Sequence, residues 1–91
     1  MKYFSWSNEK NEKLKTERGV SFEAVVLCVE KGKVLDIVEN PNNERYVGQR
    51  MFIVDIDEYA YLVPFVESDR EIFLKTIIPS RKATKKYLKT S

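Results

Sequence analysis

The spacing of apolar residues changes near residue 34, from the helical period to the alternation that is typical of strands. Before that point, four apolar residues follow an i, i+3, i+4, i+7 spacing: Phe22, Val25, Val26 and Val29. With Ser21 as N-cap and Gly32 after the end, they predict a helix that runs to about residue 31. The polar segment 8–18, capped by Ser7 or Asn8 and ended by Gly19, predicts a surface helix.

Alternating apolar residues predict five strands. Residues 2–6 form a short first strand, and four more are expected at 34–38, 51–56, 59–66 and 71–78. The residues between them are typical of turns, with a turn cluster at 40–43 whose loop extends to about 49, a tight turn at 57–58 and another at 68–70. Pro64 indicates a bulge or an edge-facing position, because it cannot donate to a strand ladder. Pro79 ends the last strand, and Ser80 caps a final helix.

The order of these elements, β-α-α-β-β-β-β-α, separates helices from strands and predicts an α+β fold. We expect a small antiparallel sheet whose strands follow one another as a meander, with the helices packed on one of its faces. Ninety-one residues are enough for one domain, spanning 1–91. Since no apolar run is long enough for a membrane helix or a signal peptide, we expect a cytoplasmic protein without membrane contact.

The net charge of +2 conceals a strong polarity along the chain. Residues 21–78 carry six basic and eleven acidic side chains, whereas 79–91 carry five basic side chains and no acidic one. Arg81 and Lys82 fall at the predicted helix N-terminus, where cations oppose the helix dipole. A phosphate bound there would relieve this conflict, although the basic residues could also form a solvated tail.

The absence of histidine excludes imidazole catalysis and histidine metal sites. Cys28, the only cysteine, lies among apolar residues and is expected to be a small buried side chain rather than a reactive thiolate. Asp55 and Asp57 are spaced as a pair that could bind a divalent ion on a strand, but their position at a tight turn favours a structural role.

Six aromatic residues exceed the needs of so small a core, and such residues either cover a thin core or stack on nucleobases: Tyr3, Trp6, Tyr46, Tyr59, Tyr61 and Tyr87. For Tyr59 and Tyr61 we favour the structural role.

Three segments resemble BrnT-type toxins of bacterial type II toxin–antitoxin modules. Residues 4–11, FSWSNEKN, resemble the F-x-W-[DN]-x-x-K opening of that family. Residues 17–23, ERGVSFE, resemble its K-H-G-V-S-F-E segment, with Arg18 in the place of the histidine. Residues 77–84, IIPSRKAT, resemble its I-I-S-A-R-K-A-T block. The resemblance implies a RelE-like fold, metal-independent cleavage of RNA, and neutralisation by an antitoxin with a DNA-binding domain such as ribbon-helix-helix. Operator DNA would be bound only through that complex.

The resemblance also implies roles for individual residues, because RelE-like toxins act through Lys, Arg, Tyr or Glu. Arg81 and Lys82 would neutralise the phosphate, with Arg50 and Lys75 as candidates on the same surface. Tyr87 or Glu71 would move a proton. Contacts with the RNA are expected from Lys10, Lys85, Lys86, Lys89 and Trp6, and no metal or cofactor is required.

Two other functions remain open from the sequence. The first is a toxin-like protein that binds a partner protein or nucleic acid without cleaving it. The second is a metal-dependent phosphodiesterase that uses Asp55 and Asp57, for which activity would depend on a divalent ion.

Overall fold

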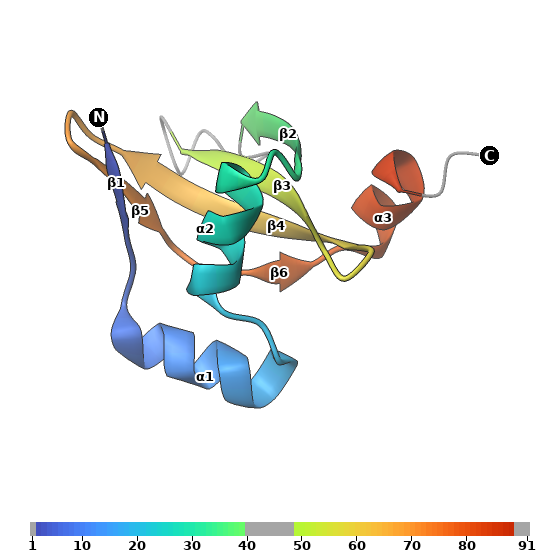
Figure 1. Cartoon of the computed structure of the whole chain (residues 1–91), viewed down its shortest axis with the longest axis horizontal. Coiled ribbons are helices and arrows are strands. Elements are labelled where there is room, and N and C mark those ends of the chain that lie inside the picture. The colour runs from blue at the N-terminus through green and yellow to red at the C-terminus, as the bar shows by residue number, and fades with distance from the viewer. Residues whose placement is uncertain (1, 40–48, 89–91) are drawn as a thin grey trace.

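The computed structural model describes residues 2–39 and 49–88 of the chain (Figure 1). Within these ranges it forms an α+β fold of three helices and a mixed six-stranded sheet. The predicted turn at 40–43 and most of its loop lie outside the described residues, as do Tyr46 and Lys89. None of the described helices is long and apolar enough to cross a bilayer.

The helices and strands follow the predicted order, except that the last predicted strand is divided into two. Their bounds are β1 Tyr3–Ser5, α1 Asn8–Arg18, α2 Phe22–Glu30, β2 Val34–Glu39, β3 Arg50–Ile56, β4 Tyr59–Glu67, β5 Glu71–Leu74, β6 Ile78–Pro79 and α3 Arg81–Tyr87.

Serine caps begin all three helices. The side chains of Ser7, Ser21 and Ser80 each accept a hydrogen bond from the backbone N–H three residues later. Gly19 ends α1 in the left-handed conformation with φ of 67°, which glycine adopts without a steric penalty. The predicted helix boundaries at both ends of α1 are therefore confirmed.

One pair of strands is parallel, so the expectation of an entirely antiparallel sheet is wrong. The strand order is β1-β5-β4-β3-β2, with β6 also paired to β4. β1 runs parallel to β5 in a register that pairs Tyr3 with Glu71. The two helices after β1 separate it from the hairpins that follow, and it joins the sheet at the edge that β5 leaves open. Alternation identifies a strand but not its partner or its direction, which is why the sequence does not reveal this pair.

Pro64 belongs to β4 and faces the segment that separates β5 from β6. Its carbonyl accepts the N–H of Lys75 at 2.8 Å, and in this antiparallel geometry its nitrogen, which carries no hydrogen, faces the same strand. Phe65 pairs with Leu74, and Leu62 pairs with Ile78. The two paired positions are three residues apart on β4 but four residues apart on the facing segment, which therefore has one extra residue. The extra residue interrupts the ladder opposite the proline, in agreement with the predicted bulge.

The hairpin between β3 and β4 turns at Asp57 and Glu58, as predicted. Both residues have positive φ, at 52° and 66°, which is the conformation of the two-residue turns that match the twist of a hairpin. The Asp55 carboxylate accepts the N–H of Glu58 at 2.9 Å. Asp55 therefore stabilises this turn, which supports the structural role favoured from the sequence.

The helices cover both faces of the sheet, so the expectation that they share one face is wrong. Phe52 and Val54 of β3 belong to the core cluster formed with α1 and α2, whereas Ile53 belongs to a second cluster with Ala83 of α3. Alternate residues of a strand point to opposite faces, which places α3 opposite α2. The nearly continuous apolar run of β3 is the signal for a strand that is covered on both sides.

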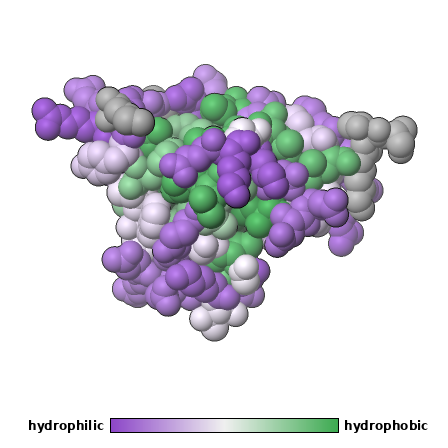
Figure 2. Space-filling model, viewed as in Figure 1, coloured by the Kyte–Doolittle hydropathy of each residue, from purple (hydrophilic) through white to green (hydrophobic). Residues whose placement is uncertain are grey.

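The larger core lies between the sheet and α2, with the rings of Phe52 and Phe65 stacked 4.2 Å apart. α1 contributes Leu14 to this core, and it is otherwise a polar helix, as the hydrophilic surface at the bottom of Figure 2 shows. Tyr61 packs against the larger core and contacts Tyr59 edge to face, which supports the role predicted for both.

Asn11 connects α1 to α2 from a buried position. Its side-chain oxygen accepts the buried N–H of Phe22 at 2.8 Å, and its amide nitrogen donates to Glu23 at 2.7 Å. This second hydrogen bond is the main reason that the pKa of Glu23 is lowered from its usual value.

We expect Asn11→Ala to lower the free energy of unfolding by about 1–3 kcal/mol, because it leaves the buried Phe22 N–H without a partner. Urea unfolding measures this loss, and NMR titration should show the pKa of Glu23 rising towards its usual value. Asn8→Ala, a change at an exposed position of α1, is the matched control. Equal stability of the two variants would contradict the proposed role of Asn11.

Candidate nucleic-acid interface

α3 presents a basic surface and docks through its opposite side. Ala83 and Thr84 are buried, whereas the four cationic residues of the helix are exposed: Arg81, Lys82, Lys85 and Lys86. Tyr87 and Leu88 pack against the smaller core cluster. Ala83 and Thr84, together with Tyr87 and Leu88, form the docked side of the helix.

Backbone groups of Ala60 in β4 hold the start of α3. The Ala60 carbonyl accepts the N–H of Ser80 at 3.0 Å, and the Ala60 N–H donates to the Thr84 hydroxyl at 2.9 Å. The same hydroxyl donates to the Ser80 carbonyl at 2.8 Å. Both bonding sites of one strand residue are thus used to position the helix, and these groups are buried from water.

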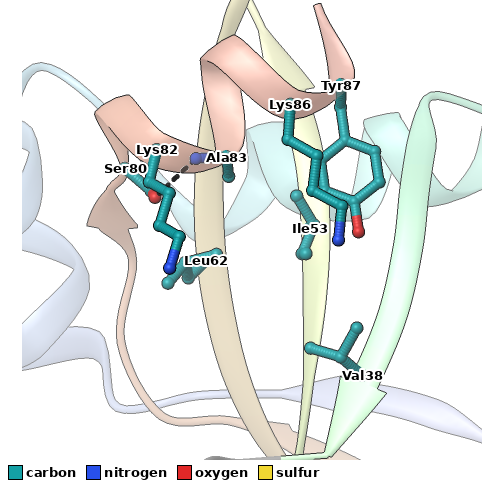
Figure 3. A pocket seen from close by; sticks show the side chains of 8 residues that line it. All are labelled: Val38, Ile53, Leu62, Ser80, Lys82, Ala83, Lys86 and Tyr87. Atoms are coloured by element: carbon teal, nitrogen blue, oxygen red, sulfur yellow. Dashed lines mark hydrogen bonds between the residues drawn. The ribbon is translucent and has the colours of Figure 1, made fainter.

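A pocket of about 320 Å³ lies between α3 and the sheet (Figure 3). Its floor comes from β2, β3 and β4, and its wall comes from the helix. The lining residues are Val38, Ile53, Leu62, Ser80, Lys82, Ala83, Lys86 and Tyr87. None of these residues is acidic.

Two lysines stand at the helix side of this pocket. Lys82 and Lys86 are one helical turn apart, and their side chains point from α3 towards the sheet, that of Lys82 over Leu62 (Figure 3). Two ammonium groups above an apolar floor can bind an anion and, beside it, a flat apolar group. This combination suits a phosphate attached to a nucleoside.

Tyr87 donates its hydroxyl hydrogen to the Asp36 carboxylate of β2 at 2.6 Å. This hydrogen bond raises the pKa of Tyr87 above its usual value, with burial as the next cause. It is also the main cause of the lowered pKa of Asp36, which in addition accepts the N–H of Ile37. A tyrosine whose proton is held in this way is poorly suited to remove a proton from a substrate, so Tyr87 serves here to position the helix.

Two predicted catalytic residues do not line the pocket. Arg50 pairs in register with Phe65 and, an odd number of residues from Ile53 along β3, lies on the opposite face of the sheet. Its guanidinium pairs with Glu67 and lies over the Phe65 ring, on the α2 side of the sheet. Glu71 begins β5 beside Tyr3. The structure does not bring either residue together with α3.

The remaining predicted residues divide between the two sides of the sheet. Lys75 follows β5 and lies near the Phe73 ring, on the face that carries α3. Lys10 is on α1, and Trp6 stacks on Phe22 at a centroid distance of 5.7 Å within the larger core. Lys10 and Trp6 are therefore on the side away from the pocket.

Cys28 and the acidic pair do not form a reactive site. Cys28 is buried, and burial is the main cause of its raised pKa, as expected for a structural cysteine. Its thiol donates to the carbonyl of Asp55. Within the described part of the chain, no three ligating side chains are grouped so that they could hold a metal ion.

The contacts of three residues near the site were not identified from the sequence. Thr84 and Asp36 hold the two ends of α3, and Arg18 donates from its guanidinium to the Ile77 carbonyl at 2.5 Å. Thr84 and Arg18 fall inside the segments that resemble the toxin family, which marked the positions but not the contacts. Asp36 carries no comparable signal, because its partner is 51 residues away.

We expect Thr84→Val to destabilise the protein by about 1–3 kcal/mol, because the buried Ala60 N–H loses its acceptor while the side-chain volume is kept. Thr84→Ser keeps the hydroxyl and is the matched control. Urea unfolding should rank the wild type first, then T84S, and T84V last. If T84V is as stable as T84S, the hydroxyl does not anchor α3.

We expect Asp36→Asn to lower the pKa of Tyr87 towards the usual value for tyrosine, because the carboxylate that stabilises its proton is removed. In the wild type, this hydrogen bond stabilises the fold fully between the usual pKa values of aspartate and tyrosine. The stabilisation is lost as the pH rises through the raised pKa of Tyr87 and as it falls through the lowered pKa of Asp36. NMR titration of tyrosine ring carbons measures the shift. An unchanged Tyr87 titration in D36N would show that the bond does not form in solution.

Comparisons of the chain with models of protein families, with curated proteins and with solved structures find no match. The candidate site therefore depends on the geometry itself. Its central feature is the apolar pocket beneath α3, with Lys82 and Lys86 beside it.

Proposed function

We propose that this protein is the toxin of a type II toxin–antitoxin module, similar to the BrnT type, with a RelE-like fold. It acts as a metal-independent endoribonuclease that inhibits growth by cleaving RNA. The observation that carries the proposal is the pair of lysines, Lys82 and Lys86, above the apolar pocket. Arg81 and Lys85 extend the same positive surface along the exposed side of α3.

The chemistry needs a phosphate held beside an activated ribose hydroxyl. When the 2′-OH attacks the neighbouring phosphate, its proton passes to water, the bond from phosphorus to the 5′-oxygen breaks, and the released oxygen takes a proton from water. Negative charge grows on the phosphoryl oxygens during this step. Lys82 and Lys86 would bind those oxygens and stabilise this charge, and the apolar floor formed by Leu62 and Ile53 would hold the adjoining nucleoside.

Contacts among the three family-like segments support the proposed fold. Trp6 of the first segment stacks on Phe22 of the second. Arg18 of the second donates to Ile77 of the third. Segments that are distant in the sequence thus form one connected structure, which reaches the start of β6 through Ile77.

The partners follow from the same proposal. RNA is the substrate, and an acidic or amphipathic segment of the cognate antitoxin would cover α3 by charge complementarity. The antitoxin would carry the DNA-binding domain, so operator DNA would be bound only by the complex.

One observation favours a non-catalytic alternative. Glu71 lies away from the pocket, and the Tyr87 hydroxyl is held by Asp36, so the two predicted proton-transfer groups do not converge on the lysines. Arg50, predicted to help neutralise the phosphate, lies on the other face of the sheet. A protein that binds RNA or a partner at α3 without cleaving it would need only the lysines and the pocket.

We expect expression of the chain without a partner to arrest growth, and the purified protein to cleave RNA in the presence of a chelator. Lys82→Ala/Lys86→Ala should reduce cleavage by about a hundredfold or more, as the loss of groups that stabilise transition-state charge does. Lys13→Ala/Lys31→Ala removes the same charge from exposed positions of α1 and the end of α2, and should leave the rate unchanged.

Intact RNA together with retained RNA binding would exclude cleavage and support the non-catalytic alternative. Equal losses in both double variants would show that net charge, rather than the pocket, determines activity. Cleavage that stops when the chelator is added would exclude the metal-independent mechanism.

A further inference from the structure

α3 covers only one end of its face of the sheet. Leu62 of β4 packs into the cluster beneath the helix, but Val66, further along the same face of that strand, is 44% exposed. Tyr3 of β1, on the same side, is 59% exposed. Neither Val66 nor Tyr3 packs against either core cluster. This part of the sheet is therefore an apolar surface without a partner in the described chain.

An aromatic ring and a cation lie at the centre of that surface. Phe73 pairs in register with Val66, is half-buried and packs into neither core cluster. The Lys75 ammonium lies 5.9 Å from the centre of the Phe73 ring. We call Val66, Phe73, Lys75 and Tyr3 the open face.

The open face continues from the lysine pocket. Leu62 lines the pocket, and Val66 lies four residues further along β4, a distance of roughly 13 Å. Lys75 lies between them, because its N–H donates to the carbonyl of Pro64. A path across the sheet thus begins at Lys82, passes Lys75 and reaches Phe73.

We propose that the open face binds single-stranded RNA that extends from the phosphate in the pocket, with a base stacked on Phe73 and the next phosphate bound by Lys75. This inference rests on the proposed function and adds a second binding subsite to it. Aromatic rings bind bases of any sequence, and lysines follow the backbone charge.

The charges and the neighbouring groups favour RNA over a protein partner. Three cations lie along this path, Lys82, Lys86 and Lys75. Of the acidic side chains, Asp36 is near Lys86 and is bonded to Tyr87, and Glu71 stands beyond Phe73, next to Tyr3. Ser5 pairs in register with Phe73, but its hydroxyl is buried and is not accessible to a base on this surface.

The test measures binding of a short RNA with 2′-O-methyl groups, which cannot be cleaved, by fluorescence anisotropy. Phe73→Leu keeps an apolar side chain but removes the aromatic face, and it should weaken binding by about five- to a hundredfold, the usual effect of one lost base stack. Phe73→Tyr should bind like the wild type. Lys75→Ala should remove about one phosphate contact. The slope of the logarithm of the binding constant against the logarithm of the salt concentration should then become less steep by about 0.7.

Leu27→Ala, at an exposed apolar position of α2, and Lys13→Ala are the matched controls and should have no effect. If F73L and K75A bind RNA as the wild type does while the Lys82/Lys86 variant does not, the open face is excluded as an RNA-binding surface. The proposed RNA binding at the lysine pocket is then unaffected. If the wild type binds no RNA, both proposals fail. Cross-linking of the bound RNA to Phe73, located by mass spectrometry, would support the subsite independently of any effect on folding.

Discussion

The candidate site depends on one connection between the sheet and α3. The carbonyl of Ala60 in β4 accepts the N–H of Ser80, and the N–H of Ala60 donates to the Thr84 hydroxyl. A helix of seven residues is too short to be stable alone, so its position must come from the sheet. Ser80 and Thr84 supply that position by bonding the carbonyl and the N–H of a fully buried residue. The lysines of α3 that line the pocket are therefore positioned by hydrogen bonds in which none of their side chains takes part.

The division of the sheet into two faces gives each part of the chain a separate task. The face beneath α1 and α2 carries the larger core, with Phe22, Phe52 and Phe65 as its largest members, and it accounts for most of the buried apolar area. The other face buries only a few small or medium side chains, Met51, Ile53, Ala60 and Ala83, and leaves room for a ligand. Stability and binding can thus vary independently, because they use opposite sides of the same strands.

Local features of the fold were predictable, and long-range ones were not. Ser7, Gly19 and Ser80 define helix ends through contacts within a few residues, so the sequence pattern identifies them. The parallel pairing of β1 with β5 and the placement of α3 depend on contacts between distant segments, which alternation does not encode. For the site, the run of basic residues indicated α3 as a candidate anion-binding helix. The charge pattern could not show that Arg50 forms an ion pair with Glu67 or that the Tyr87 hydroxyl donates to Asp36.

Asp36 also bears on strand pairing between two molecules of this protein. Among the described strands, β2 is the outermost on its side of the sheet, and an outermost strand exposes backbone groups that another chain can pair with. Its register shifts between Val34 and Asp36, and the Asp36 carboxylate accepts the N–H of Ile37. An incoming strand would have to displace this side chain and follow an irregular edge, so the residue that steadies α3 also protects the sheet against self-association.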